Sequence, residues 1–214
     1  MLPQIEAILV TKGAEYAAVC RGLQKTRAEV KVIPIPMGVS GLRSYLQTAR
    51  LTQQKVLLLG LAGSLNPKYR LGNIVIYQSC CYQTPAGELL EKECQEIPTR
   101  LSGSLVKGLT CDRLIHTSLA KAEQSLHTGA DVVDMESWVI RETFPEVAIL
   151  RVISDNYEQN LPDLNLALDS QGNLNPFSLA LRMSQQPIAS GRLIISSLKA
   201  LKVLQKTTTA LFLE

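Results

Sequence analysis

Short runs of β-branched and aliphatic residues alternate with stretches of helical periodicity along almost the whole chain, and this pattern most constrains the fold. Strands are predicted at residues 5–10, 30–35, 55–59, 72–82 and 147–154. Helices are predicted at residues 14–24, 42–51, 118–127, 136–143, 176–184 and 191–206. This alternation predicts an α/β fold: three layers, with a central mixed, mostly parallel sheet between helices. The length of 214 residues predicts one domain, 1–214.

Composition and charge exclude several classes of protein. The 22 Lys and Arg nearly balance the 19 Asp and Glu, for a net charge of +3, which argues against a nucleic-acid partner. A hydrophobic content of 46% excludes a disordered chain. The longest apolar run, residues 56–62, is far shorter than the ~20 residues needed to span a bilayer. The first ten residues lack the basic region and the cleavage site of a signal peptide, so we expect a cytoplasmic protein.

The cysteines and histidines do not form a metal-binding pattern. The five cysteines include no CxxC pair, and the chain has only two histidines. A zinc site therefore has too few ligands at the usual spacings. Cys80 and Cys81 are adjacent and point to opposite faces if they lie on a strand, which makes a bond between them strained. We expect free thiols, no metal and no cofactor.

Polar or glycine residues gather where four of the predicted strands end, at residues 13–15, 60–64, 134–136 and 154–155. Ligands of parallel α/β sheets bind at the carboxyl ends of the strands. We therefore expect these four segments to form one site. The second segment, GLAGS, is predicted to be a turn whose backbone N–H groups can approach a ligand. It matches neither the phosphate-binding GK[ST] loop nor GxGxxG.

Three carboxylates at these strand ends are candidate catalytic or binding groups. Burial of Asp155 after the strand LRVISD favours the neutral acid, which suits general acid catalysis. The alternative is that its side chain caps the following turn. Glu136 in VVDMES could accept hydrogen bonds from two sugar hydroxyls, with Met135 packing on the sugar. The alternative for Glu136, and for Glu15, is a helix N-terminal acid that complements the helix dipole.

Taken in order, these motifs resemble the nucleoside phosphorylase and nucleosidase superfamily. The similarity lies in LLLGLAGSLNPKYRLGNIVI, VVDMESWVI and LRVISDN, and it extends from Ile8 to Gln205. The DMES tetrapeptide, the preceding pattern from Lys121 to Ala130 and the LP after Ser154-Asp155 are most similar to the bacterial hopanoid-associated phosphorylases. The resemblance implies a phosphorylase/hydrolase-like fold that cleaves the N-glycosidic bond of a nucleoside.

The resemblance also implies roles for individual residues. Asp155 would protonate or hydrogen-bond purine N7, with Ser154 beside it, and Glu15 would orient the attacking water. Glu136 would hold the ribose 2′ and 3′ hydroxyls, with Met135 against the sugar. The other implied site residues are Ala62, Gly63 and Ser64 near the nucleophile, and Ile115, His116 and Thr117 near the base.

Several alternatives stay open on the sequence alone. Leu58 and Leu61 stand where phosphorolytic relatives carry Arg and Thr or Ser, and VTKGAE replaces their GDPxR loop, so the co-substrate is either phosphate or water. The substrate is either a lipid-linked adenosine such as adenosylhopane or a methylthioadenosine-like nucleoside. A non-catalytic nucleoside-binding protein is a further alternative. By analogy we expect a homo-oligomer.

The last predicted helix bears on the lipid-linked alternative. From Leu193 to Lys206, leucines and isoleucines lie on one face and Lys199, Lys202 and Lys206 on another. A basic amphipathic helix of this kind can lie on a membrane surface. The alternative is a helix that packs on the core with a solvated basic face.

Overall fold

Eight strands form one mixed sheet in the computed structural model, which describes residues 5–96, 103–165 and 176–213. Among these residues five of the eight strand pairings are parallel, as predicted. The strands are β1 (Ala7–Thr11), β2 (Lys31–Ile35), β3 (Lys55–Ser64), β4 (Ile74–Gln83), β5 (Leu89–Glu93), β6 (Ser104–Thr110), β7 (Val132–Asp134) and β8 (Glu146–Asp155).

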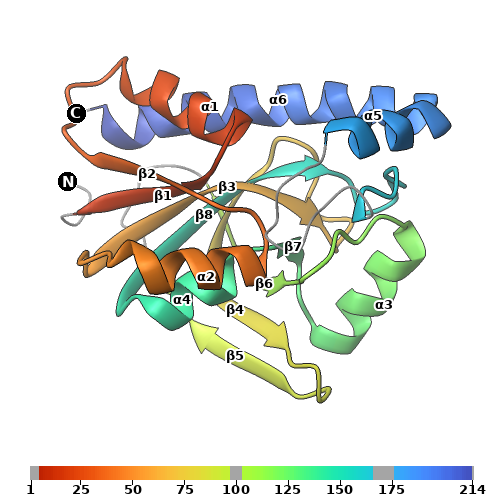
Figure 1. Cartoon of the computed structure of the whole chain (residues 1–214), viewed down its shortest axis with the longest axis horizontal. Helices are drawn as coiled ribbons and strands as arrows, with labels where there is room; N and C mark the ends of the chain where they lie inside the picture. The colour runs from red at the N-terminus through yellow and green to blue at the C-terminus, as the bar shows by residue number, and fades with distance from the viewer. Residues whose placement is uncertain (1–4, 97–102, 166–175, 214) are drawn as a thin grey trace.

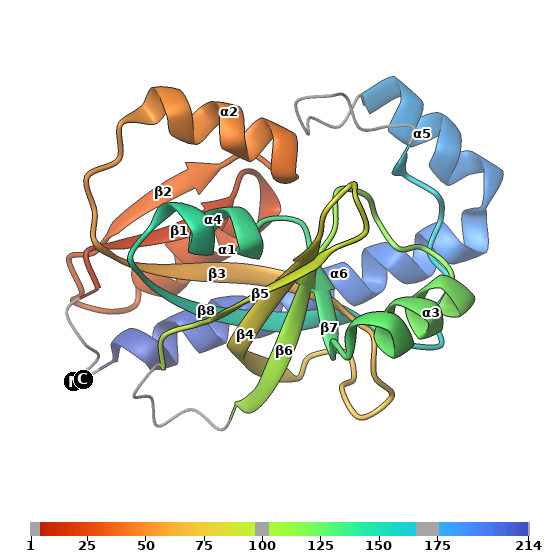
Figure 2. The same cartoon turned by 90° about the horizontal axis from the view of Figure 1, so that it is seen from below.

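Helices cover both faces of the sheet, which confirms the three-layer prediction (Figure 1). The helices are α1 (Ala14–Leu23), α2 (Val39–Ala49), α3 (Ser118–Thr128), α4 (Ser137–Thr143), α5 (Pro176–Gln185) and α6 (Pro187–Phe212). In Figure 1, α1 and α6 lie above the sheet and α2 and α4 below it, while α3 and α5 lie beyond one end of it. Figure 2 shows α2 and α4 side by side on their face. A separate buried apolar cluster fills the space between the sheet and each helical layer.

Part of the sheet closes on itself. Strands β3, β8, β4, β6 and β7 pair in that order, and β7 pairs again with β3. Strands β1 and β2 extend the sheet from β3, and β5 extends it from β4. The closure brings the ends of β3, β7 and β8 next to one another: Gly63 pairs with Val133 on one side and with Asp155 on the other.

The predicted turn at residues 60–64 is wrong, because β3 continues through it to Ser64. This part of β3 pairs with β8 and β7, which supplies its backbone hydrogen bonds. Neither Gly60 nor Gly63 has the positive φ that a glycine turn would use. Gly60 is needed for space instead: a Cβ there would lie under 3.0 Å from side-chain atoms of Arg151 and Glu15. A register shift between Ala62 and Gly63 marks a local irregularity of the strand.

The remaining predicted elements are found with small changes at their ends. The last helix is longer than predicted, since it begins at Pro187 and ends at Phe212. All five cysteines are free, as expected, and Cys80 and Cys81 lie in different apolar clusters. Trp138 is buried in the cluster that contains α4. Among the helices that the structure describes, none is both long and apolar enough to span a bilayer.

Candidate active site

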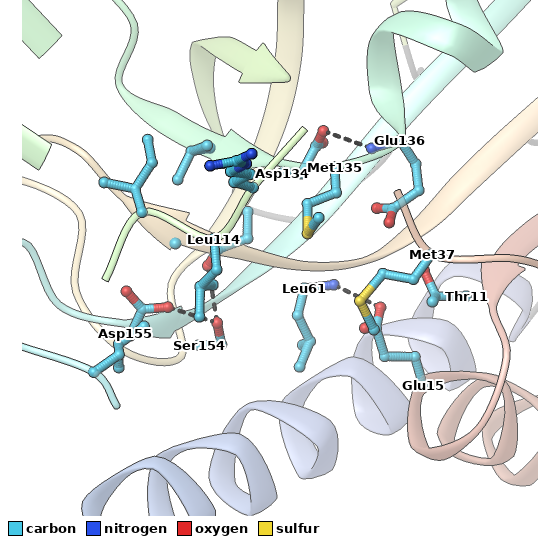
Figure 3. A pocket seen from close by; sticks show the side chains of 16 residues that line it. Thr11, Glu15, Met37, Leu61, Leu114, Asp134, Met135, Glu136, Ser154 and Asp155 are labelled. Atoms are coloured by element: carbon cyan, nitrogen blue, oxygen red, sulfur yellow. Dashed lines mark hydrogen bonds between the residues drawn. The ribbon is translucent and has the colours of Figure 1, made fainter. Parts of the chain in front are cut away.

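A cavity of about 160 Å³ lies where the four predicted strand-end segments meet. Figure 3 shows that these segments face a common space. Its wall includes Glu15, residues 61–63, residues 134–136 and residues 154–155. Thr11, Met37, Leu114 and Leu161 also line it, and sequence reasoning did not identify them. The cavity is therefore lined by both carboxylates and aliphatic side chains.

Glu15 lies in the first turn of α1, directly after β1. Gly13, which precedes the helix, has a φ of 97°, a left-handed conformation that favours glycine at this sharp entry. Oε2 of Glu15 accepts a hydrogen bond from the backbone N–H of Leu61 at 2.9 Å. Burial raises the pKa of Glu15 to about 7, while the Arg151 guanidinium and the Leu61 N–H act in the opposite direction. A carboxylate with a pKa near neutrality is well matched to general base catalysis.

Glu136 projects into the cavity from the junction of β7 and α4. Its Oε1 accepts a hydrogen bond from the N–H of Gly38 at 3.1 Å, and its Oε2 accepts one from Nη2 of Arg151 at 3.3 Å. Burial raises the pKa of Glu136, and Arg151 opposes this. Glu136 is the N-cap residue of α4, but its side chain makes no capping hydrogen bond. Glu136 thus stands at the N-terminus of α4, as the alternative of a helix N-terminal acid requires, while its side chain points into the cavity and not to the helix N–H groups.

The capping role belongs to Asp134 instead. Its Oδ1 accepts hydrogen bonds from the N–H groups of Glu136 and Ser137, at 3.2 and 3.1 Å. Its Oδ2 accepts one from the hydroxyl of Tyr77 at 2.9 Å and lies 3.1 Å from Nη2 of Arg151. This network holds the turn at residues 134–136 rigidly and directs Met135 and Glu136 toward the cavity (Figure 3).

Arg151 is the cation that balances the acidic side of the site. It lies in the middle of β8 and is fully buried. Burial acts to lower the pKa of Arg151, but the charges of Asp134 and Glu136 outweigh it and raise the pKa above its ordinary value. Sequence reasoning assigned it no role, although a single arginine within the apolar strand EVAILRVISD was a usable signal.

Asp155 ends β8 and lines the cavity with a side chain that is only 7% exposed. Its Oδ2 lies 2.5 Å from Nζ of Lys121, which is fully buried on α3. Its Oδ1 accepts a hydrogen bond from the hydroxyl of Ser154 at 3.0 Å. The sequence predicts an isolated buried acid at Asp155, whereas the structure places the buried ammonium group of Lys121 beside it.

Only part of the predicted nucleophile region lines the cavity. Ala62 and Gly63 line the cavity, but Ser64 does not. Ser64 is fully buried, and its hydroxyl donates to the carbonyl of Asn66 at 2.7 Å and thereby stabilises the bend after β3. Both carboxylate oxygens of Asp155 would lie 3.2 Å from a Cβ at position 63, so glycine gives this group its space.

Likewise, only some of the predicted base-binding residues line the cavity. Ser154 and Ile115 line the cavity, together with Leu114. Thr117 lies outside it as the N-cap of α3, because its hydroxyl accepts from the N–H of Ala120. His116 also lies outside, with its backbone carbonyl accepting from the N–H of Leu161 at 2.7 Å. Leu114 and Ile115 therefore give this part of the cavity an aliphatic wall.

Few cations are available for a phosphate ion. Among the described residues that line the cavity, Arg113 is the only cationic side chain, and it is exposed. Lys12 is exposed and does not line the cavity, and Arg43 is engaged 3.1 Å from Glu142. Among the residues that the structure describes, no three His, Cys, Asp or Glu side chains are grouped so that they could hold a metal ion.

Solved structures match the chain over nearly its whole length. A 5′-methylthioadenosine/S-adenosylhomocysteine nucleosidase (MTAN) from Chlamydia trachomatis, an Asp-to-Asn mutant bound to 5′-methylthioadenosine, matches with a TM-score of 0.63 and 16% identity, covering 95% of each chain. The chain has the nucleosidase fold.

Two further structures share this nucleosidase fold. A Helicobacter pylori MTAN mutant with 5′-methylthioadenosine in its active site gives a TM-score of 0.61 and 15% identity, covering 96% of this chain and 98% of the other. A futalosine hydrolase mutant from the same organism gives a TM-score of 0.57 and 15% identity, covering 90% of this chain and 97% of the other. No protein-family model and no curated protein matches the chain in sequence comparisons.

Proposed function

We propose that the protein hydrolyses the N-glycosidic bond of an adenosine derivative and releases adenine. The observation that carries the proposal is the convergence of Glu15, Glu136 and Asp155 on one cavity, each from a different strand end. The three carboxylates have different surroundings and therefore suit different tasks. The fold adds support, because the neighbours named above are methylthioadenosine nucleosidases and a futalosine hydrolase.

Each carboxylate has a defined part in the proposed reaction. Glu15, with a pKa of about 7, takes the proton of the attacking water. Glu136 accepts hydrogen bonds from the ribose hydroxyls, and Met135 packs against the sugar as it becomes an oxocarbenium-like cation. Asp155 interacts with N7 of the base, so that the base departs neutral rather than as an anion. The aliphatic wall at Leu114 and Ile115 contacts the base.

Hydrolysis is favoured over phosphorolysis by the charges around the cavity. A phosphate dianion needs several positive donors, whereas the described wall offers the exposed Arg113 and four carboxylates, those of Glu15, Asp134, Glu136 and Asp155. Water needs only a base and space. Glu15 supplies the base, and the small residues Ala62 and Gly63 line the same cavity.

The size of the 5′ substituent distinguishes two versions of this proposal, a methylthioadenosine-like and a lipid-linked substrate such as adenosylhopane. One observation favours the lipid-linked version. Residues 176–213 contain five of the chain's Lys and Arg and none of its Asp and Glu. Ile188, Ile195 and Leu198 on α6 are 73%, 57% and 59% exposed. Apolar side chains among cations are suited to the surface of an anionic membrane.

Adenine release by the purified protein tests the main proposal. Substrates are 5′-methylthioadenosine, S-adenosylhomocysteine and an adenosine with a long 5′-alkyl chain, each with and without phosphate. We expect phosphate-independent release, with the free 5-substituted ribose as the second product. Formation of a sugar 1-phosphate would assign a phosphorylase instead. No release from any substrate, together with equal nucleoside binding by wild type and Asp155→Asn, would identify a binding protein.

Vesicle sedimentation and oligomer mass test the lipid-linked version. We expect binding to vesicles that contain anionic phospholipid, weaker binding to neutral vesicles, and loss of binding in the double variant Ile195→Ser, Leu198→Ser. Leu126→Ser is the control, because Leu126 is 89% exposed on α3. If the double variant instead converts a dimer to a monomer without changing vesicle binding, the apolar face is a contact between copies of this chain.

A further inference from the structure

Two segments of the cavity wall belong to none of the helices and strands named above. Residues 111–117 contribute Leu114 and Ile115 to the wall, and residues 156–165, the strap, contribute Leu161. Because neither segment is part of the sheet or of a helix, the position of these three aliphatic side chains depends on the contacts that the two segments make with each other.

The side chain of Asn165 binds both backbone groups of Leu114. Its Oδ1 accepts a hydrogen bond from the N–H of Leu114 at 2.7 Å, and its Nδ2 donates one to the carbonyl of Leu114 at 3.0 Å. One side-chain amide thus supplies the donor and the acceptor that a neighbouring strand would offer. Leu114 lines the cavity, whereas Asn165 does not (Figure 3), so Asn165 can act on a ligand only through other residues.

A third contact fixes the orientation of this amide. Nδ2 also donates to Oδ1 of Asp163 at 2.9 Å, and the same oxygen accepts from the backbone N–H of Asn165 at 3.0 Å. The backbone hydrogen bond lowers the pKa of Asp163, so this acceptor is a carboxylate at neutral pH. Both hydrogens of the amide and its oxygen therefore have partners. A rotated amide would place its NH₂ group against the N–H of Leu114.

Two further hydrogen bonds join the strap to the other segment. The N–H of Leu161 donates to the carbonyl of His116 at 2.7 Å, and Oδ1 of Asn160 accepts from the N–H of Ser118 at 2.8 Å. Leu161 itself is only 4% exposed and lines the cavity. The strap is therefore tied to every second residue from Leu114 onward, and Asn165 makes two of the four hydrogen bonds.

We propose that Asn165 is a positioning residue that holds the aliphatic wall of the cavity in place for the base of the substrate. This inference rests on the proposed function, which supplies the base. A wall that is ordered in only a fraction of the molecules lowers the apparent affinity by that fraction. Glu15 and Glu136 come from other elements, so they stay in place when the wall loosens. Asn165 therefore acts on binding of the base more than on cleavage of the bond.

Calorimetry with adenine tests the inference without turnover. Adenine reaches the wall but has no sugar to engage Glu136. Asn165→Ala removes both hydrogen bonds to Leu114, so the Kd for adenine should rise by roughly 5- to 30-fold, the value of one or two neutral hydrogen bonds. For any nucleoside that the wild type cleaves, KM should rise by a similar factor while kcat changes little, as expected when an interaction common to substrate and transition state is lost.

Hydrogen exchange of the Leu114 amide, followed by NMR, separates positioning from a general loss of stability. In Asn165→Ala this amide should lose most of its protection, while the amides of β3 and β8 keep theirs. Asn73→Ala is the matched control, because Oδ1 of Asn73 also accepts from a backbone N–H, that of Arg70 at 2.8 Å, away from the cavity. The control should change neither the adenine affinity nor the exchange of Leu114.

A second variant keeps the test open if Asn165→Ala does not fold. Asn165→Asp has nearly the same shape and retains an acceptor for the N–H of Leu114. It places a negative charge against the carbonyl of Leu114 and the carboxylate of Asp163, in place of the donor that both now accept from. Adenine binding should therefore weaken in Asn165→Asp as well.

Three results would overturn the inference. The first is a folded Asn165→Ala or Asn165→Asp protein that binds adenine as tightly as wild type. The second is unchanged exchange of the Leu114 amide in Asn165→Ala, and the third is a loss in kcat with an unchanged KM. A wild type that binds adenine more tightly than Asn165→Ala but cleaves no nucleoside would refute the proposed function alone. A wild type that does not bind adenine would overturn both.

Discussion

The backbone N–H of Leu61 donates a 2.9 Å hydrogen bond to Oε2 of Glu15, and this bond ties the first turn of α1 to β3. It fixes one carboxylate oxygen at the cavity wall, where Figure 3 shows the two residues joined. Burial nevertheless raises the pKa of Glu15 to about 7. A group that titrates near neutrality can accept a proton from water and release it within one catalytic cycle.

The first prediction concerns the pH dependence of adenine release. Because the base must be ionised, kcat/KM should fall about tenfold per pH unit below the Glu15 pKa of about 7. In Glu15→Gln, kcat should fall by ~10²–10⁴-fold, and the decrease of kcat/KM at low pH should disappear. Glu142→Gln is the control, because Glu142 is exposed and pairs with Arg43. If kcat/KM of Glu15→Gln still falls at low pH as in wild type, a group other than Glu15 causes the fall.

Glu15 also makes stability depend on pH. Its pKa rises from 4.5 in the unfolded chain to about 7 in the folded one, so the folded state binds more protons between these values. Stability is therefore lost as pH rises through this window. Glu15→Gln should be more stable than wild type at pH ~8, by ~1–3 kcal/mol, and the advantage should disappear near pH 4.5. Thermal melts across this range measure it.

The second prediction concerns Gly60, where the side chains of Arg151 and Glu15 leave no space for a methyl group. A Cβ at this position would lie under 3.0 Å from both side chains. Gly60→Ala should therefore displace the Glu15 carboxyl group and lower kcat by ~10²-fold, since small misplacements of reacting groups are that costly. Gly191→Ala on α6 is the control, because a Cβ there meets nothing within 4 Å. Equal activity of both variants would contradict the close packing at Gly60.

The third prediction concerns the buried charge of Arg151. Arg151→Met leaves the buried carboxylates of Asp134 and Glu136 without their cation, so the protein should lose ~3–5 kcal/mol of stability. Arg43→Met breaks an exposed pair with Glu142 and should cost less than ~1 kcal/mol. Chemical denaturation of the two variants makes the comparison. A similar small loss in both would mean that Arg151 is not the main partner of these carboxylates.

The strand ends that form the site were predictable because they follow from local patterns. Glycines and carboxylates next to apolar runs are visible in the sequence, and parallel strands place their carboxyl ends together. The positions of Glu15, Glu136 and Asp155 around one cavity agree with that expectation. The roles assigned to these residues remain predictions.

The contacts between distant elements were not predictable in this way. Lys121 and Asp155 lie 34 positions apart, and nothing in α3 marks its lysine as buried rather than solvated. The two glycines of the GLAGS segment give a local turn signal, which strand pairing overrides. The resemblance places His116 and Thr117 near the base, whereas the helix N-cap determines the position of Thr117.

The last prediction concerns Glu136 and the sugar. Glu136→Gln keeps an oxygen that can accept from the N–H of Gly38 but removes the charge that faces Arg151. A hydrogen bond to a charged group contributes ~1.5–3 kcal/mol, so kcat/KM should fall by roughly 10- to 100-fold. The test compares each substrate with its 2′-deoxy and 3′-deoxy forms. If Glu136 holds these hydroxyls, removing them should reduce kcat/KM strongly in wild type and little in Glu136→Gln. If removal of a hydroxyl lowers kcat/KM by the same factor in both proteins, another group binds the ribose hydroxyls.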